Sequence, residues 1–257
     1  MSGLLACRGL GVRRGRRVLV EDFDFSLAAG EIVAVVGPNG AGKSSLLATL
    51  AGLLPPESGG VFMDGRPLAR LSPRRIASRL GFLPQDSQDP YPATVLETAL
   101  IGRHPHIGFW QWESAADVAK ARAALRRVGL APAAARAIAT LSGGERRRLA
   151  IATLLTQAPQ IYLLDEPLET LDFAYQARLL RLLRGLARLA GAGIMLSLHD
   201  LSLAARHADR AVLLDGRGGA AVGSAREVLR AGPIAAAYGC RVRVLEMEGL
   251  PFYVVGG

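Results

Sequence analysis

Short apolar runs alternate with stretches of helical periodicity along most of this chain. Runs rich in β-branched residues and leucine predict buried strands at residues 31–36, 161–164, 194–198 and 211–214. Apolar positions with helical spacing predict helices over 46–54 and 173–190. Strands that alternate with helices favour a mostly parallel sheet flanked by helices, so we expect an α/β fold.

The ends and the middle of the chain have different patterns. Alternating apolar and polar residues predict an N-terminal antiparallel β piece over 4–30 and a small hairpin over 241–255. Between 86 and 157, β-branched residues become rarer and alanine becomes more frequent, which indicates an inserted α-helical subdomain. We therefore expect a single domain over the whole chain, in which 1–85 and 158–257 form a core around the insert.

A glycine-rich turn lies between the first of these strands and the following helix. Its residues fit the pattern G-x-x-x-x-G-K-[ST]: Gly37, Pro38, Asn39, Gly40, Ala41, Gly42, Lys43 and Ser44. Glycines let backbone N–H groups close around an anion, and the helix N-terminus favours negative charge. Lys43 would reach the outer phosphates of a nucleotide, and the Ser44 hydroxyl would bind Mg²⁺. The alternative, a glycine-rich turn that fits by chance, is disfavoured by the strand before it and the helix after it.

The composition makes the lysine of this turn informative. The chain has 31 basic residues, and only Lys43 and Lys120 are lysines. A compact ammonium group fits a phosphate cradle where a planar guanidinium would not. We infer that Lys43 is required by the turn itself.

A second helix start has the same anion-facing character. Ser142 and Glu145 form the pattern S-x-x-E, a capping box that begins a helix. Gly143 and Gly144 occupy the first turn, so their N–H groups would be open to an anion. In isolation, this pattern is more typical of an ordinary helix cap.

Two of the predicted strands end in residues with catalytic chemistry. Asp165 and Glu166 follow one strand; Asp165 suits the outer coordination sphere of Mg²⁺, and Glu166 can orient or deprotonate a water molecule. His199 follows the next strand. Solvated carboxylates and a structural histidine are the alternatives. Because α/β sheets place ligands at the carboxyl ends of their strands, we expect all three side chains near Lys43.

Composition limits the environment and the partners. The chain has 257 residues, of which 50% are hydrophobic, enough for a large core. We find no signal peptide, and the longest uncharged apolar segment, 149–164, is too short to span a bilayer, so we expect a soluble cytosolic protein. Cys7 and Cys240 lack metal-site spacing and should be reduced. The net charge of +9 would suit nucleic acid or an anionic membrane, but scattered arginines favour a solvated basic surface.

Taken together, these stretches resemble an ATP-binding-cassette ATPase, the motor subunit of ABC transporters. Six motifs occur in the order of that family: Walker A (37–44), Q-loop (Gln85), signature (141–145), Walker B (161–166), D-loop (171–172) and switch histidine (His199). Each is moderately specific by itself, whereas six in this order over nearly the whole chain are highly specific.

The resemblance implies a P-loop NTPase core that binds ATP and Mg²⁺. It assigns three sets of residues: nucleotide binding to the loop and Ser45, metal binding to Ser44, Gln85 and Asp165, and catalysis to Glu166, His199 and Gln85. The resemblance also implies a head-to-tail homodimer. Ser142 and Gly144 of one copy, with Gly143 between them, would contact the γ-phosphate held by the other copy, and Asp172 would lie at the seam.

A finer resemblance is to the importer subunits that take up iron–siderophores, haem or cobalamin. It rests on Pro84 and Gln85, on 101–105, on the short insert and on the tail 238–242. The implied partners are membrane permease subunits, whose coupling helix would enter a groove formed by Gln85 and the insert. A substrate-binding protein would act indirectly, and no nucleic acid is expected. The subunit would then lie at the cytoplasmic face of the plasma membrane, held there through the permease.

Two alternatives to the importer motor stay open at this point. One is the ATPase of an exporter or of another importer class. The other is a non-transport cassette that acts on nucleic acid, although such proteins usually carry two cassettes or long inserts.

The sequence departs from the family pattern in three places. Glu145 replaces the more usual glutamine of the signature, and Leu168 and Glu169 replace small residues before the D-loop. The aromatic residue that normally stacks on adenine is missing, and arginines occupy the matching region, 12–15. Because a guanidinium face can stack on any base, we expect loose base selectivity.

Overall fold

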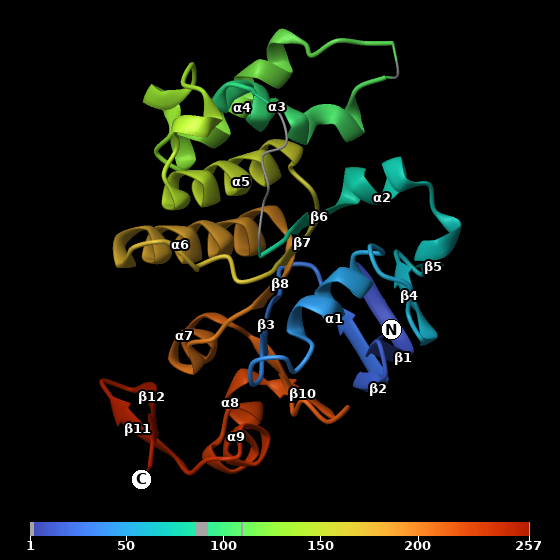
Figure 1. The fold of residues 1–257 in the computed structure, drawn as a ribbon, viewed down its shortest axis with the longest axis vertical. Coiled ribbons are helices and arrows are strands. Elements are labelled where there is room, and N and C mark those ends of the chain that lie inside the picture. The colour runs from blue at the N-terminus through green and yellow to red at the C-terminus, as the bar shows by residue number, and fades with distance from the viewer. Residues whose placement is uncertain (1–2, 86–91, 109, 257) are drawn as a thin grey trace.

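The computed structural model of the chain describes residues 3–85, 92–108 and 110–256. Figure 1 shows a central sheet with helices, a smaller N-terminal sheet beside it, and a helical insert at the top of the view. The first residues of the predicted insert, 86–91, lie outside the described residues.

The central sheet has the strand order β10-β9-β3-β8-β7-β6. Its strands are β3 (Ile32–Val36), β6 (Leu80–Leu83), β7 (Ile161–Leu164), β8 (Gly193–Ser197), β9 (Arg210–Leu214) and β10 (Ala220–Ser224). Neighbouring strands are parallel, except that β10 runs antiparallel to β9. Every residue of β3 is buried, because Val33 and Val35 pack into one core cluster while Ala34 and Val36 pack into another on the opposite face. The predicted α/β fold is confirmed.

The N-terminal sheet is antiparallel, as predicted, with the order β2-β1-β4-β5. Its strands are β1 (Leu5–Arg14), β2 (Arg17–Leu27), β4 (Ser58–Met63) and β5 (Arg66–Pro67). Helix α1 (Lys43–Leu50) lies between the two sheets in Figure 1, and its buried leucines share a core cluster with residues of β1 and β2. The phosphate loop is therefore anchored by both sheets.

Helix α1 begins and ends earlier than the predicted range of 46–54. After its last residue, Leu50, the chain turns at Gly52, which has a φ of 75°. Glycine adopts this left-handed conformation without a steric penalty, so it commonly ends a helix. Leu53 and Leu54, which had the spacing of a helical face, are 61% and 44% exposed.

The insert is helical, as predicted. It contains α3 (Val95–Leu100), η2 (Ile101–His106), α4 (Ala115–Arg127), η3 (Ala131–Ala133), η4 (Ile138–Thr140) and α5 (Gly143–Gln157). A reciprocal capping box starts each of α3, α4 and α5, at Thr94, Ser114 and Ser142. The buried ion pair of Arg103 and Asp117, with 2.8 Å between Nε and Oδ1, joins η2 to α4.

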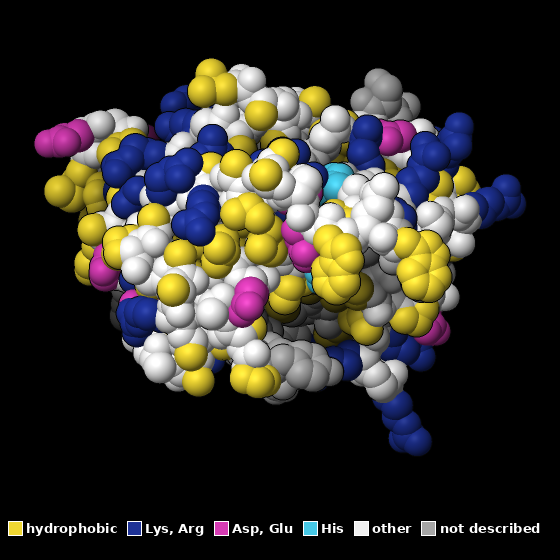
Figure 2. Space-filling view, turned by 90° about the horizontal axis from the view of Figure 1, so that it is seen from above, with side chains coloured by type: hydrophobic (Ala, Val, Ile, Leu, Met, Phe, Trp, Pro, Cys, Tyr) yellow, Lys and Arg dark blue, Asp and Glu magenta, His cyan; other side chains and the backbone are white. Residues whose placement is uncertain are grey.

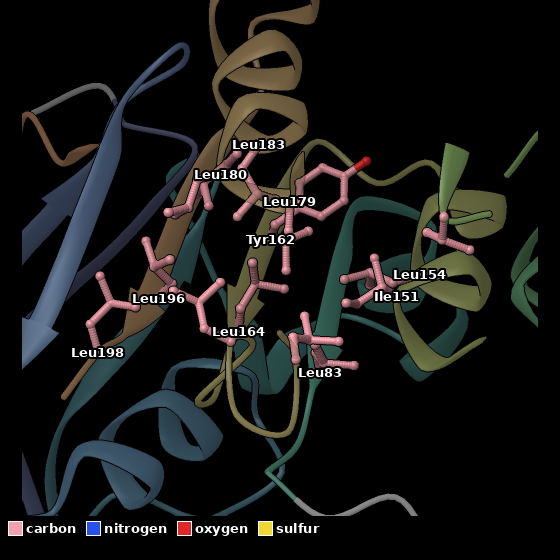
Figure 3. Packing of buried hydrophobic residues seen from close by; sticks show 14 of the residues in the cluster. Leu83, Ile151, Leu154, Tyr162, Leu164, Leu179, Leu180, Leu183, Leu196 and Leu198 are labelled. Atoms are coloured by element: carbon pink, nitrogen blue, oxygen red, sulfur yellow. The ribbon is translucent and has the colours of Figure 1, made fainter. Parts of the chain in front are cut away.

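One hydrophobic cluster joins the insert to the central sheet. In Figure 3, Leu83 of β6 and Leu164 of β7 face Ile151 of α5, and Leu180 of α6 (Phe173–Ala190) packs beside Leu196 of β8. Because α5 rests on this core, its N-terminus has a fixed position relative to the strand ends.

The remaining elements cover the ends of the sheet. They are η1 (Leu68–Arg70), α2 (Pro73–Arg79), α7 (Leu201–His207), α8 (Ala225–Val228), α9 (Ala231–Tyr238), β11 (Val242–Met247) and β12 (Leu250–Val255). Strands β11 and β12 form the predicted tail hairpin. Cys7 and Cys240 are free thiols. Among the helices of the described residues, none has the length and hydropathy needed to cross a membrane.

The basic surface was predicted to be dispersed. Figure 2 shows the molecule from the side of the insert, where arginine and lysine side chains form several separate groups between apolar and uncharged side chains. On this face, the charges do not form the continuous stripe that a nucleic-acid duplex would require.

Candidate active site

A cavity of about 520 Å³ opens where α1 begins, beside the carboxyl ends of the central strands. Most predicted site residues line it: Asn39, Gly40, Gly42, Lys43, Ser44, Ser45, Gln85, Glu166 and His199. Gly37, Pro38 and Ala41 belong to the same loop, and Asp165 lies buried behind Glu166. The prediction that Lys43, Glu166 and His199 meet at one sheet edge is confirmed.

The phosphate loop holds Lys43 ready for an anion. The side chain is 5% exposed, and its Nζ donates to the carbonyl oxygens of Gly37 at 2.9 Å and Pro38 at 3.4 Å. Burial lowers the pKa of Lys43, an effect that the nearby charges of Glu166 and Asp165 partly oppose. A bound phosphate would stabilise the ammonium form further.

Glycine is required where the loop enters α1. Gly42, the N-cap residue, has a φ of 105°, and a Cβ atom there would lie 2.8 Å from Cβ of Leu19. No side chain caps this helix start. Its first N–H groups lack intrahelical acceptors and are left for a ligand.

Glu166 is held from two sides inside the cavity. Its Oε1 lies 2.6 Å from Nε2 of His199, and its Oε2 accepts a hydrogen bond of 3.0 Å from Nε2 of Gln85. Gln85 also donates to Oε2 of Glu169 at 3.3 Å. The Glu166 side chain is only 9% exposed, whereas that of His199 is 52% exposed. A buried carboxylate beside an exposed imidazole is suited to orient a water molecule.

Ser197 is a site residue that the sequence analysis missed. Its hydroxyl group donates to Oδ1 of Asp165 at 2.7 Å and accepts the N–H of Glu166 at 2.7 Å. It thereby fixes both consecutive acids, of which Asp165 is 2% exposed. A lone polar residue inside the apolar run 193–198 was the available signal.

The signature residues lie outside the cavity. Ser142 caps α5 by accepting the N–H of Glu145 at 3.2 Å, and Ser142 and Gly143 are exposed. Asp172 is also exposed and caps α6 by accepting the N–H of Tyr175 at 2.9 Å. Within one copy, these residues and Gly144 have local helix-starting roles, and the structure does not bring them to Lys43.

Arginines occupy the part of the cavity wall contributed by the N-terminal sheet. Arg14 and Arg17 line it beside Leu19, and Nη2 of Arg17 donates to the carbonyl oxygen of Gly216 at 2.8 Å. Both side chains are exposed. Of the two arginines in the region 12–15, where the aromatic residue was expected, Arg14 thus lies in the cavity wall, whereas Arg13 pairs with Glu57.

Comparisons with known proteins agree with this geometry. The sequence profile of the family described as ABC transporter matches residues 20–169. The hemin import ATP-binding protein HmuV of Myxococcus xanthus (strain DK1622) is 43% identical over 255 residues, which cover 96% of this chain and 94% of that protein. The cobalamin import ATP-binding protein BtuD of Halobacterium salinarum (strain ATCC 29341 / DSM 671 / R1) is 40% identical over 237 residues, covering 92% of this chain and 59% of that protein.

Solved structures give the same answer for the fold. A transporter described as of the metal-chelate type, in an inward-facing conformation, matches with a TM-score of 0.84 and 27% identity, covering 99% of this chain and 98% of that one. A solved ATP-binding subunit of an ABC transporter matches with a TM-score of 0.78 and 27% identity, covering 91% and 95%. The chain therefore belongs to the ABC transporter family, as an ATP-binding subunit that hydrolyses ATP.

Proposed function

We propose that this chain is the motor of an importer for a metal chelate, namely an iron–siderophore, haem or cobalamin. The observation that carries the ATPase part is the cavity in which the phosphate loop, Lys43, Glu166 and His199 meet. The import part is supported by the similarity to HmuV and BtuD, whose names specify hemin and cobalamin import. The chelate itself would contact the permease and the binding protein rather than this chain.

Hydrolysis would proceed by direct attack of water on the γ-phosphorus. The loop amides and Lys43 hold the phosphates, and Glu166 orients the water and accepts its proton while the bond to the bridging oxygen breaks, releasing ADP and phosphate. Because Nε2 of His199 lies 2.6 Å from Oε1 of Glu166, contact of His199 with the γ-phosphate would require its ring to move away from Glu166. That movement would free one carboxylate oxygen for the water.

The residues present fit a magnesium ion. Ser44, Gln85 and Asp165 all offer oxygen atoms, and in residues 3–85, 92–108 and 110–256 no cluster of histidine, cysteine and acids forms a complete metal cage. This is the pattern that Mg²⁺ prefers, since it is usually held by one or two carboxylates together with substrate phosphates. Held by Ser44, Gln85 and Asp165, the ion would supply positive charge that neutralises the phosphates.

Two copies would complete the site head to tail. The exposed N-terminus of α5, with Ser142, Gly143 and Gly144, would meet the γ-phosphate held by Lys43 of the other copy. Asp172 would lie at the seam, and the next residue, Phe173, is 90% exposed, as expected of a side chain that a partner covers.

The partners of the dimer follow from this arrangement. Permease subunits would dock against the groove between Gln85 and the insert, and a substrate-binding protein would act through them. The dimer would lie at the cytoplasmic face of the plasma membrane, and we expect no nucleic-acid partner.

The variant Glu166→Gln tests the catalytic part. Turnover should fall by about 10²- to 10⁴-fold, the usual contribution of acid–base help, while ATP binding stays intact and a dimer accumulates. Steady-state hydrolysis, nucleotide titration and size-exclusion chromatography with ATP measure the three quantities. Glu169→Gln removes a charge from the same wall without the His199 contact and should cost far less. A fully active, monomeric Glu166→Gln would contradict the role given to Glu166.

Reconstitution tests the transport part. The chain should co-purify with its permease, and a chelate-loaded binding protein should stimulate hydrolysis in proteoliposomes. Stimulation by a substrate on the ATPase side would instead indicate an exporter. Salt-sensitive binding to RNA or DNA would favour a nucleic-acid function.

A further inference from the structure

The guanidinium group of Arg147 joins the helical insert to the catalytic strand ends. Arg147 lies in the second turn of α5 and is 5% exposed. Its Nη1 donates to the carbonyl oxygens of Pro84 at 2.6 Å and Gln85 at 3.0 Å. Its Nη2 donates to those of Asp165 at 2.5 Å and Glu166 at 2.7 Å. Four carbonyl groups that flank the predicted catalytic residues thus converge on one side chain.

The contacts are divided between two neighbouring strands. β6 and β7 pair in parallel up to Leu83 and Leu164, and the last ladder bond runs from the Asp165 N–H to the Leu83 carbonyl at 2.8 Å. Beyond this bond, Nη1 of Arg147 binds the segment that follows β6, and Nη2 binds the segment that follows β7. The planar fork of arginine suits this task, because its donors point in fixed and different directions.

The backbone of Glu166 needs such support. Its φ of 47° is left-handed, which a residue with a side chain rarely adopts without restraint from its surroundings. Ser197 binds its N–H at 2.7 Å, and Arg147 binds its carbonyl oxygen. The backbone of Glu166 is thus held at its N–H and at its carbonyl group, and its carboxylate contacts Gln85 and His199.

We propose that Arg147 is a positioning residue for hydrolysis, which locks Gln85 and Glu166 to the helix that carries the signature residues. The proposal rests on the proposed roles of Glu166 and Gln85. It goes further in making α5 and the catalytic carboxylate one mechanical unit, so that movement of the signature end also moves Glu166. None of these four hydrogen bonds is with the phosphate loop, so their loss should affect turnover rather than ATP binding.

The variants Arg147→Gln and Arg147→Lys test this role in the full-length chain. For Arg147→Gln we expect kcat to fall by about 10- to 100-fold, as for a small misplacement of a catalytic group, while the Kd for ATP changes by less than about twofold. Arg147→Lys should recover part of kcat, because an ammonium group keeps the charge but cannot bind both strands with a fixed fork.

Arg148→Gln is the matched control on the same helix. Nη1 of Arg148 donates to the Tyr175 hydroxyl at 2.7 Å, and its guanidinium lies 4.1 Å from the centre of that ring. This variant also removes one positive charge and a packing contact of the same helix. It leaves the hydrogen bonds to the catalytic strand ends in place. We expect a lower Tm with kcat within about twofold of wild type.

The outcomes separate the possibilities. Wild-type kcat in Arg147→Gln, or a joint loss of kcat, ATP affinity and Tm, would overturn the proposal in favour of ordinary packing. If Arg147→Gln does not fold, Arg147→Lys is the test. A lower kcat with an unchanged Kd for ATP supports the proposal, and a wild-type kcat contradicts it. An inactive Glu166→Gln beside a fully active Arg147→Gln would remove this inference only, whereas a fully active Glu166→Gln would remove the proposed function itself.

Discussion

The N-termini of α1 and α5 both begin with glycines, yet only one of them forms a site within the chain. At α1, no side chain caps the helix, and its first N–H groups face a cavity of about 520 Å³ beside the buried Lys43. At α5, Ser142 and Glu145 cap each other reciprocally, and the glycines between them are not among the residues that line that cavity. The same local motif therefore has two different surroundings.

The difference shows what a helix N-terminus needs in order to bind a phosphate. The dipole and the open amides are common to both ends and contribute modestly by themselves. Lys43 and the Glu166 carboxylate line the cavity at the start of α1, and the signature residues of α5 do not. We infer that α5 supplies donors to a phosphate that is already held elsewhere, which is why a second copy would be needed.

Of the variants that compare the two helix ends, the largest expected effect comes from blocking the α5 end. Ser142→Arg should reduce turnover by about a hundredfold, because its bulk would keep the two copies from closing on the γ-phosphate. ATP binding to a single copy should be unchanged. Hydrolysis assays and nucleotide titration check both statements, and wild-type hydrolysis would contradict the shared site.

Removing the α1 cation should act on binding instead. Lys43→Ala loses charge-assisted hydrogen bonds of about 1.5–3 kcal/mol, so ATP affinity should fall by roughly 10- to 100-fold. Titration with a fluorescent ATP analogue measures this loss. Equal affinity in wild type and variant would mean that the loop amides alone hold the phosphates.

Mixing the two variants tests whether the ends belong to one shared site. In mixed dimers of Lys43→Ala with Ser142→Arg, one site carries both lesions and the other carries neither. Random pairing should therefore restore at most about a quarter of the wild-type activity if the dimer is symmetric. Each variant alone is the control, and recovered activity would exclude sites contained within single copies, because every copy in the mixture carries a lesion.

The smallest effect concerns the base, far from either helix end. Arg14, from the region where an aromatic residue is usual, lines the cavity together with Arg17, so hydrolysis of ATP and GTP should agree within about threefold. Competition assays with both nucleotides measure the ratio. Strict use of ATP would mean that the wall recognises adenine in some other way.

Local signals were sufficient for most of the fold. Apolar runs placed the buried strands, and helix 173–190 was predicted at its observed bounds because its apolar stripe is continuous. The helix over 46–54 was wrong at both ends, since Gly52 ends it and the phosphate loop starts it early. Ser197 and Arg147 were missed for different reasons. Ser197 carried a faint signal, but Arg147 is the middle one of three consecutive arginines, and nothing local distinguishes it from its neighbours.

The sequence alone determined the phosphate loop, the acids at the strand end and their order along the chain, because each depends on residue types at short spacing. Only the tertiary structure decided which arginine is buried, how Ser197 holds both acids, and which helix end faces a cavity. These properties depend on contacts between residues far apart in the chain. Arg147, for example, reaches carbonyl groups 62 and 19 residues away. The rotation of α5 about its own axis decides which of the three arginines faces the strand ends. That rotation is fixed only when the helix packs on the core.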